Sequence, residues 1–243
     1  MAYRVKSTTN KKSKPRKFLV FSAHPDDLDF GCAGTIATLT AKGNEVAYCI
    51  ITNGEKGTHK VSQTCEEMIA MREREQRAAG AIVGVSDIHF LRETDGDLEH
   101  TAELRRRLIR VMREVKPDVV LSADPGNHLF DSFGRFHRDH RITAEAVFDA
   151  IYPATASHAF FPELKQEDLL PHQMQGVWFF GTDRPNMFVD ISKTIGKKLA
   201  ALRAHESQIP DVKKMEERIR TRAKNEGKKK KMRYAETFRR LMF

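Results

Sequence analysis

The chain has 243 residues, 40% of them hydrophobic, and a formal net charge of +9, which suits a folded domain with a buried core and excludes a disordered chain. No stretch approaches the roughly 18 consecutive apolar residues of a membrane helix and the basic N-terminus lacks the apolar region of a secretory signal, so we expect a cytoplasmic protein without a membrane anchor. Its three cysteines, Cys32, Cys49 and Cys65, are odd in number and lack CxxC spacing, which argues against a disulfide framework and a cysteine metal site.

Strands and helices are expected to alternate along the first 151 residues. The apolar pattern predicts, in chain order, a strand at 18–22, a turn at 23–31, a helix at 32–41, a strand at 45–52, a helix at 66–83, a strand at 88–91, a helix at 102–115, a strand at 119–122 and a helix from 137 toward 151. Beyond Pro153 the pattern loosens. We expect two more strands at 176–181 and 187–191, and helices at 193–207 and 212–240, the last interrupted near Gly227.

Alternating helices and continuous apolar strands are typical of a parallel sheet covered on both faces. We therefore predict an α/β fold: a Rossmann-like, mostly parallel sheet flanked by helices on both faces, with a smaller C-terminal strand and helix extension. The α/β domain is expected to span residues 17–210. A basic flexible arm at 1–16 is expected to precede it, and a basic C-terminal helical extension at 211–243 to follow it.

The positive charge is concentrated at the two ends of the chain. Residues 1–17 carry seven Lys or Arg and no acid, and residues 211–243 carry thirteen basic residues against five acids. The body between them is therefore slightly acidic. Solvated charge that keeps the protein soluble is the favoured interpretation, although basic ends can also contact nucleic acid, an anionic membrane surface or an acidic partner. The acidic body argues against a dedicated nucleic-acid-binding protein.

A histidine and two adjacent carboxylates follow the first strand directly, in the sequence AHPDDLDFGCAGT at 23–35. In an open α/β sheet the site lies outside the carboxyl ends of the strands, near the point where the strand order reverses. These side chains are therefore expected to face that crevice. His24 and Asp27 can both bind a divalent cation, and Asp26 is a neighbouring carboxylate that is free to act as a base.

A second group of polar side chains, in the sequence HRDH at 137–140, follows the fourth strand. His137 and His140 are three residues apart, so at the start of a helix both can face the same crevice. A catalytic zinc site usually has three protein ligands and one open position. Since the first and fourth strands are expected to be neighbours across the switch point, the two groups are expected to meet.

These residues also have ordinary structural interpretations. A lone histidine is usually a surface or core residue, and Asp26, Asp27 and Asp29 could cap the following helix, where its dipole favours carboxylates. Asp29 is expected to cap the helix or to support the site. The coincidence of HPDD with HxxH after two parallel strands nevertheless favours a site. A dinucleotide-binding protein is disfavoured because the first turn carries no G-x-G-x-x-G.

Taken together, the segments AHPDDLDFGCAGT at 23–35 and HRDH at 137–140 resemble the LmbE-like and PIG-L-like N-acetylglucosaminyl deacetylase family. Three further segments resemble the same family in order: TNGEKG at 52–57, R-x-x-E at 72–75 and H-x-S-Q at 205–208. The resemblance implies a zinc ion held by His24, Asp27 and His140. It also implies that Asp26 is the general base that takes a proton from zinc-bound water.

The resemblance assigns the remaining residues of HRDH as well. His137 would stabilise the oxyanion or protonate the leaving amine, and Asp139 would tune the His137 imidazole. Arg138 stands where the family commonly has proline. This departure touches no implied ligand but can alter the rim of the substrate site.

Three residues near the strand ends are candidates to bind sugar hydroxyls: Arg72, Asn53 and Asp95. The family resemblance favours Arg72. The alternative, equally open, is that Arg72 forms a buried ion pair with Glu75 or Glu55 and only braces a loop.

The resemblance thus implies a zinc-dependent N-deacetylase that hydrolyses the acetamide of an N-acetylglucosamine-containing small molecule with metal-activated water. The alternative is a zinc amidase of the same family acting on a different amide, such as a thiol conjugate or an acylated glycoside, since the same residues would serve both. The expected partner is an N-acetylated sugar or sugar conjugate. Nucleic acid is not expected to be a partner. Because family members often assemble into trimers or hexamers, a homo-oligomer is a further possibility.

Overall fold

The central strand β1 (Lys17–Ser22) contributes to two separate cores, because its side chains alternate between the faces of the sheet. Phe18 and Val20 belong to one apolar cluster, and Leu19 and Phe21 belong to the other. All four side chains are at most 3% exposed. A strand with apolar residues on both sides must be covered on both sides, which is the arrangement predicted from the sequence.

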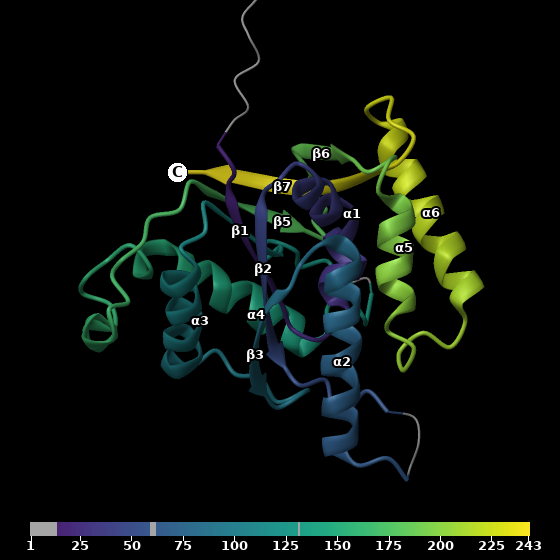
Figure 1. Cartoon of the computed structure of the whole chain (residues 1–243). Coiled ribbons are helices and arrows are strands. Elements are labelled where there is room, and N and C mark those ends of the chain that lie inside the picture. Colours follow the sequence, from purple (N-terminus) through teal and green to yellow (C-terminus); the bar gives the residue numbers. More distant parts are fainter. Residues whose placement is uncertain (1–13, 59–61, 131) are drawn as a thin grey trace, which may run out of the picture.

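The computed structural model describes residues 14–58, 62–130 and 132–243, so most of the arm expected at 1–16 lies outside the described residues. The described strands form one sheet of seven, in the order β3-β2-β1-β4-β5-β7-β6 (Figure 1). Besides β1, the strands are β2 (Glu45–Thr52), β3 (Asp87–Glu93), β4 (Val119–Ala123), β5 (Gly176–Phe180), β6 (Met187–Asp190) and β7 (Ala235–Met242). The first five strands pair in parallel, and β7 runs antiparallel between β5 and β6. The predicted mostly parallel α/β sheet is confirmed.

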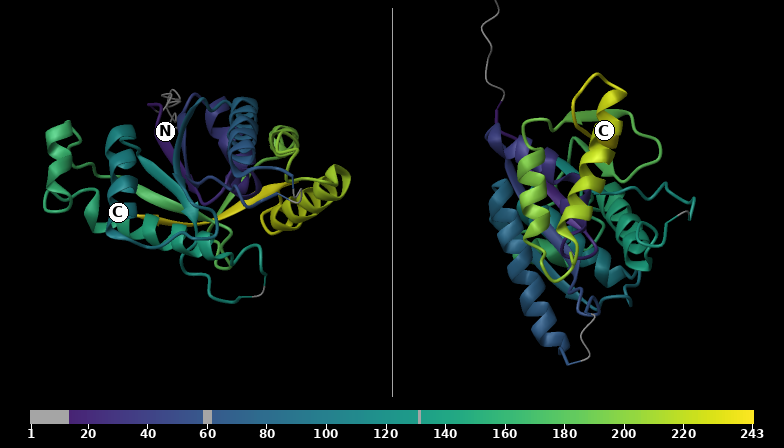
Figure 2. Two further views of the ribbon diagram at one scale, coloured as in Figure 1. Left: turned by 90° about the horizontal axis from the view of Figure 1, so that it is seen from below. Right: turned by 90° about the vertical axis from the view of Figure 1, so that its right-hand side faces the viewer.

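Helices cover both faces of the sheet (Figure 2). The helices are α1 (Asp27–Ala41), α2 (Cys65–Val83), α3 (Ala102–Val115), α4 (Arg138–Asp149), α5 (Ile195–Arg203) and α6 (Val212–Lys228), with a π-helical turn at Ala150–Ala154 and a 3-10 helix at Pro162–Glu167. One apolar cluster joins the sheet to α1, α2 and α5, and the other joins it to α3 and α4. A third cluster packs α6 against α5. Within the described residues, no helix is long and apolar enough to cross a membrane.

Helix α1 begins five residues earlier than the sequence pattern indicated. The segment 23–31 was expected to be a turn, but α1 starts at Asp27 with Asp26 as its N-cap residue. Asp27 and Asp29 lie in the first helical turn, where the positive end of the helix dipole favours carboxylates. The structural consequence is that the two aspartates of HPDD stand at the amino end of a helix, close to the end of β1, with side chains 13% and 19% exposed.

The C-terminal segment also differs from the expectation of a helix over 212–240. Helix α6 ends at Lys228, and residues Ala235–Met242 form β7, which lies inside the sheet. Gly227 makes the reversal possible, because a Cβ at this position would stand 2.5 Å from the carbonyl oxygen of Met232. Phe238 on β7 is fully buried. The segment 211–243 is therefore part of the sheet and its cover, not a helical appendage.

Candidate active site

The sheet topology brings the two histidine-containing segments to the same end of the central strands. Strand β1 lies between β2 and β4, so the strand order reverses beside it. The connection after β1 leads into α1, and the longer connection after β4 leads to α4, which begins at Arg138. Both segments therefore stand at the carboxyl ends of neighbouring parallel strands, as predicted from the topological switch rule.

Three side chains from these segments converge on one point. His24 Nδ1 lies 3.2 Å from His140 Nε2 and 3.3 Å from Asp27 Oδ2. The other carboxylate oxygen closes the triangle of side chains: Asp27 Oδ1 lies 3.0 Å from His140 Nε2. Ligands at the usual zinc–nitrogen and zinc–oxygen distances of a tetrahedral site are separated by about 3.3 Å. The spacing of the two imidazole nitrogens and the Asp27 carboxylate therefore fits one small tetrahedral cation.

The other nitrogen of His24 determines which atom is available to a metal. His24 Nε2 lies 3.0 Å from Asp95 Oδ1 and 3.1 Å from Asp139 Oδ2. Because carboxylates accept hydrogen bonds, Nε2 carries a proton, and in the neutral ring Nδ1 presents its lone pair to the point shared with Asp27 and His140. The same arrangement recurs in metal sites, where a carboxylate behind a ligating histidine fixes its tautomer.

Charge at this point supports the fit of a cation. Burial lowers the pKa of His24, but hydrogen bonds to Asp139, Asp27 and Asp95 outweigh it and raise the pKa to about 12. A second proton on His24 is thus strongly favoured when nothing else supplies positive charge among these carboxylates. A divalent cation supplies that charge in place of the proton. Two imidazole nitrogens and one carboxylate oxygen form a donor set that suits zinc.

Asp26 stands beside this triangle in an uncommon backbone conformation. Its φ is 91°, which few non-glycine residues adopt, and its side chain does not cap α1. Burial, and then repulsion from the adjacent Asp27 carboxylate, raise the pKa of Asp26 to about 6. Gln76 Oε1 accepts a hydrogen bond of 2.8 Å from the Asp26 backbone N–H. The carboxylate is therefore held in place, and its pKa is closer to neutrality than that of an ordinary aspartate.

Arg72 holds the loop that carries Asp26. Its guanidinium donates to the carbonyl oxygens of Pro25 and Gly54, at 2.6 and 2.9 Å, and to Asp26 Oδ2 at 3.2 Å. The whole residue is 4% exposed. Arg72 thus braces a loop, as in the alternative considered for it, although its ion-pair partner is Asp26 and not a glutamate.

His137 is the N-cap residue of α4, with its ring next to those of His24 and His140. Its Nδ1 accepts a hydrogen bond of 3.2 Å from the backbone N–H of Asp139, so the proton of the neutral ring is on Nε2. Burial and the nearby His24 and His140 lower the pKa of His137. The structure therefore favours a neutral His137 with one N–H to donate.

Two of the candidate residues support the site differently from the expectation. Asp139, expected to tune His137, is fully buried; its Oδ2 contacts His24 and accepts a hydrogen bond of 2.6 Å from the Gly96 backbone N–H. Asp95, a candidate for sugar hydroxyls, is 7% exposed and contacts the same His24 nitrogen. No sequence signal indicated that Asp95, far from both motifs along the chain, would orient His24.

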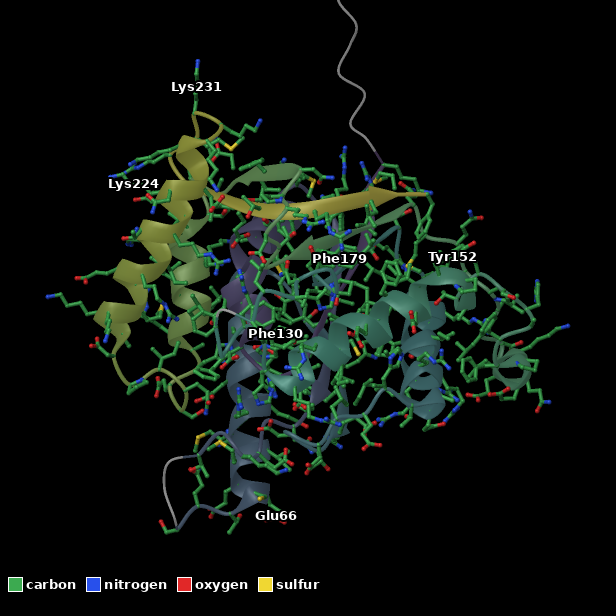
Figure 3. All side chains as sticks on the ribbon, turned by 180° about the vertical axis from the view of Figure 1, so that it is seen from behind. Glu66, Phe130, Tyr152, Phe179, Lys224 and Lys231 are labelled. Carbon is green, nitrogen blue, oxygen red and sulfur yellow. The ribbon has the colours of Figure 1, made fainter. Side chains whose placement is uncertain are left out.

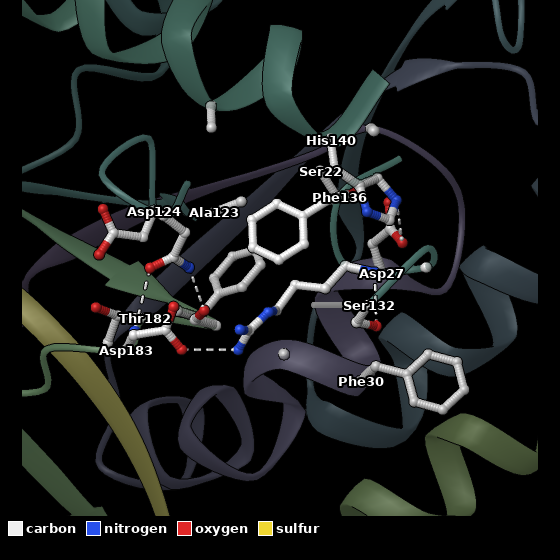
Figure 4. Close-up of a pocket in the computed structure, with 18 of the residues that line it drawn as sticks. Ser22, Asp27, Phe30, Ala123, Asp124, Ser132, Phe136, His140, Thr182 and Asp183 are labelled. Atoms are coloured by element: carbon white, nitrogen blue, oxygen red, sulfur yellow. Dashed lines mark hydrogen bonds and ion pairs between the residues drawn. The ribbon is translucent and has the colours of Figure 1, made fainter. Parts of the chain in front are cut away.

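A large cavity opens beside the candidate metal site. It has a volume of about 830 Å³, within the usual range for small-molecule sites. Among the candidate catalytic and metal-binding residues, Asp26, Asp27 and His140 line it. In Figure 4, Asp27 and His140 face one another on one side of the cavity, and Asp124, Thr182 and Asp183 stand on the opposite side.

The candidate substrate residues are not among those that line this cavity in the described part of the chain. Asn53 lies near the end of β2, where its side chain donates to the Arg92 carbonyl oxygen at 3.4 Å. Arg72 and Asp95 make the internal contacts described above. Beyond the motif residues, polar side chains line the cavity from the loops after β4 and β5, among them Asp124 and Thr182, and from α6, among them Arg222. The sequence motifs did not indicate these residues.

A buried hydrogen-bond network explains the other segments that resembled the family. Asp29 Oδ2 accepts from Gln76 Nε2 and from His205 Nε2, each at 2.9 Å. Ser207 donates from its backbone N–H and its hydroxyl to Glu75, at 2.8 and 2.7 Å. The R-x-x-E and H-x-S-Q segments thus join α2 and the end of α5 to each other, and His205 and Gln76 join them to Asp29 of α1.

The fold and the geometry together define a class: an α/β protein with a metal-dependent hydrolase arrangement, in which a carboxylate outside the ligand set stands beside two histidines and an aspartate. Comparison with known proteins gives the family. The profile of the PIG-L family, described as GlcNAc-PI de-N-acetylase, matches residues 19–151. The chain belongs to this family, and the resemblance inferred from its motifs is confirmed.

The names of similar proteins agree with this placement. Diacetylchitobiose deacetylase of Thermococcus kodakarensis is 37% identical over 230 residues, which cover 92% of this chain and 82% of the relative. Probable N-acetyl-alpha-D-glucosaminyl L-malate deacetylase 2 of Bacillus anthracis is 31% identical over 199 residues, covering 80% of this chain and 82% of the relative. Among solved structures, N,N'-diacetylchitobiose deacetylase from Pyrococcus horikoshii superposes with a TM-score of 0.88 at 32% identity, covering 98% of this chain and 88% of that chain.

Proposed function

We propose that this protein is a zinc-dependent N-deacetylase that hydrolyses the acetamide of an N-acetylglucosamine-containing small molecule. The observation that carries the proposal is the convergence of His24, Asp27 and His140, whose facing nitrogen and oxygen atoms lie 3.0 to 3.3 Å apart, beside the carboxylate of Asp26, which is not a candidate ligand. The names of the relatives support the substrate class, because they are deacetylases of GlcNAc conjugates. Membership of the PIG-L family supports the reaction.

An amide is a weak electrophile and an amine a poor leaving group, so hydrolysis requires a strong nucleophile and an acid. Zinc held by His24, Asp27 and His140 would supply a water of lowered pKa and a polarised acetyl carbonyl. The protein's own groups supply the proton transfers. Asp26 takes a proton from the attacking water at Oδ1, since Arg72 contacts Oδ2.

The leaving amine then receives, from Asp26, the proton that Asp26 took from the attacking water. His137 is neutral, so its Nε2–H donates a hydrogen bond to the oxygen on which negative charge develops. Asp26, now protonated, transfers its proton to the amine nitrogen as the carbon–nitrogen bond breaks. The products are acetate and the free amino sugar. A pKa of Asp26 raised to about 6 suits a group that must take a proton and give it back near neutral pH.

The test is release of free amine by the zinc-loaded protein from a panel of acetamides. The panel contains N-acetylglucosamine, N,N'-diacetylchitobiose, N-acetylglucosaminyl malate and inositol conjugates, and non-sugar acetamides. Turnover of sugar acetamides with zinc dependence supports the proposal. Turnover restricted to non-sugar amides would keep the metal chemistry and overturn the substrate class.

A further inference from the structure

Helix α6 contributes a cationic wall to the catalytic cavity. Arg218 and Arg222 are four residues apart, so their side chains lie on the same face of the helix. Both line the cavity that Asp26 and His140 also line. The neighbouring Ile219 is 5% exposed and belongs to the apolar cluster between α5 and α6. Packing of this core therefore orients the helix so that the two arginines face the cavity.

No side chain among the described residues neutralises the two guanidinium groups with an ion pair. Most other charges that line the same cavity are paired: Asp124 with Arg239, Asp183 with Arg135 and Glu226 with Lys229. Arg218 lies over the Phe30 ring, 5.8 Å from its centroid, and neither Arg218 nor Arg222 makes an ion pair with any residue that the structure describes. Two positive charges one helical turn apart thus remain available at the cavity wall.

The acidic lining residues that remain do not cancel this charge. Asp26 and Asp27 belong to the candidate metal site, where a divalent cation would balance them, and Glu145 lies on α4. The part of the cavity wall formed by α6 is therefore positive. Arginine is the residue best suited to hold a carboxylate or a phosphate, because its planar group donates two parallel hydrogen bonds.

We propose that the natural substrate carries an anionic group, a carboxylate or a phosphate, on the part of the molecule remote from the acetamide, and that Arg218 and Arg222 bind it. This inference rests on the proposed deacetylase function and names its substrate class more closely. It also gives a role to part of the positive charge concentrated at 211–243. That segment folds back along α5 and places two of its arginines, both exposed to solvent, along the wall of the cavity.

The experiment compares kcat/KM for an anionic substrate and a neutral one of similar size. N-acetylglucosamine 6-phosphate and N-acetylglucosaminyl malate are the anionic substrates, and N-acetylglucosamine and N,N'-diacetylchitobiose are the neutral ones. We expect a preference for at least one anion of about five- to tenfold at low salt, shrinking as salt is added, because exposed ion pairs are weak and screened. The phosphate and carboxylate arms distinguish the two kinds of anion.

The variant Arg218→Ala/Arg222→Ala should reduce the ratio of anionic to neutral kcat/KM to about one. The matched control is Arg220→Ala/Lys224→Ala, which removes two cations with the same spacing from a neighbouring face of α6. Neither control residue lines the cavity among the described residues, and Lys224 extends away from the molecule (Figure 3). The control should keep the ratio of the unmodified protein. An equal ratio in both double variants would overturn the assignment to Arg218 and Arg222.

A binding measurement separates this inference from the deacetylase proposal. Titration calorimetry with glucosamine 6-phosphate and with glucosamine reports anion binding even if no acetamide in the panel is hydrolysed. Tighter binding of the phosphate, lost in Arg218→Ala/Arg222→Ala and kept in the control variant, supports an anion site. Equal affinity of the unmodified protein for the two amino sugars, together with no preference for the malate conjugate, would refute it.

Discussion

At the scale of single residues, the site depends on carboxylates that stand behind the ligands. Asp139 and Asp95 both contact Nε2 of His24, and through it they present Nδ1 to the candidate metal. Such partners increase the basicity of the ligating nitrogen and hold its ring in one orientation. The affinity for metal should therefore depend on side chains that do not touch it.

Replacement of the buried carboxylate tests this. Asp139→Asn keeps the size of the side chain and an oxygen that can accept from His24, but it removes the negative charge. We expect zinc affinity to fall about 10- to 100-fold, measured by competition with a chelating dye. The control is Asp97→Asn, since Asp97 is 68% exposed and pairs with Lys56 at the surface. Unchanged affinity in Asp139→Asn would mean that the ligand geometry alone determines binding.

Asp26 is expected to act in proton transfer and not in metal binding. Asp26→Asn should therefore retain zinc and lose about 10²- to 10⁴-fold in kcat, the usual contribution of general acid–base catalysis. The comparison variant is His140→Ala, which should lose both the metal and the activity because it removes one of three ligands. Zinc content by elemental analysis and kcat are measured on both proteins. If Asp26→Asn turned over substrate at the original rate, Asp26 would be excluded from the mechanism.

At the scale of elements, a buried ion pair fastens α1, the helix that begins at Asp26 and Asp27, the candidate base and one candidate ligand. Lys198 on α5 and Glu236 on β7 lie 2.6 Å apart, with side chains 4% and 6% exposed. Glu236 also accepts from the backbone N–H groups of Gly34 and Thr35 on α1, at 3.1 and 2.7 Å. Lys198 donates to the Phe30 carbonyl oxygen of the same helix at 2.7 Å. One pair of charges thus joins α1, α5 and β7.

Breaking this pair should be costly, because it leaves a charge in the interior without a partner. We expect Glu236→Gln to lower the free energy of unfolding by about 3–5 kcal/mol, measured by urea denaturation. The surface pair of Lys229 and Glu226, whose lysine is 55% exposed, gives the comparison: Glu226→Gln should cost no more than about 1 kcal/mol. The double variant Lys198→Met/Glu236→Gln should recover part of the loss, since no buried charge then remains. Equal costs for the two single variants would contradict this interpretation.

Elements were predictable from the sequence where apolar periodicity determined them, and not where long-range contacts did. The parallel strands and the meeting of HPDD with HxxH followed from alternation and the switch-point rule. The start of α1 was missed because Pro25 and three aspartates suggest a turn. Strand β7 was missed because its arginines and the lysines before it resemble a helix surface. Only pairing with β5 and β6 makes that segment a strand.

In the site, too, local sequence patterns were predictable and long-range contacts were not. Its candidate ligands and base stood in two short motifs with recognisable spacing. The contacts of Asp95 and Arg72 could not be derived from spacing, because each depends on a loop that folds over from another part of the chain. The α6 wall of the cavity lies still further from the motifs along the sequence, and nothing in its local composition distinguishes arginines that face a cavity from arginines that face solvent.

At the scale of the whole molecule, the C-terminal segment is joined to the acidic body by specific ion pairs. Asp124, at the end of β4, pairs with Arg239 on β7, and the Asp124 side chain is 2% exposed. Burial by itself raises the pKa of Asp124, but hydrogen bonds from Arg239, Thr182 and the Gly126 backbone outweigh it and hold the pKa below its usual value. The pair therefore links the pH dependence of stability to the attachment of β7.

A carboxylate with a lowered pKa in the folded state contributes stability above its unfolded pKa of about 3.9, and this stability is lost as the pH falls toward the folded value. Asp124→Asn should therefore unfold at lower urea than the unmodified protein at pH 7. The difference between the two should shrink as the pH falls from about 5 to 2. The control is Asp87→Asn, because Asp87 is 61% exposed and should show little difference at either pH. A difference for Asp124→Asn that stayed constant down to pH 2 would show that packing, and not the charge of Asp124, joins β7 to the rest of the sheet.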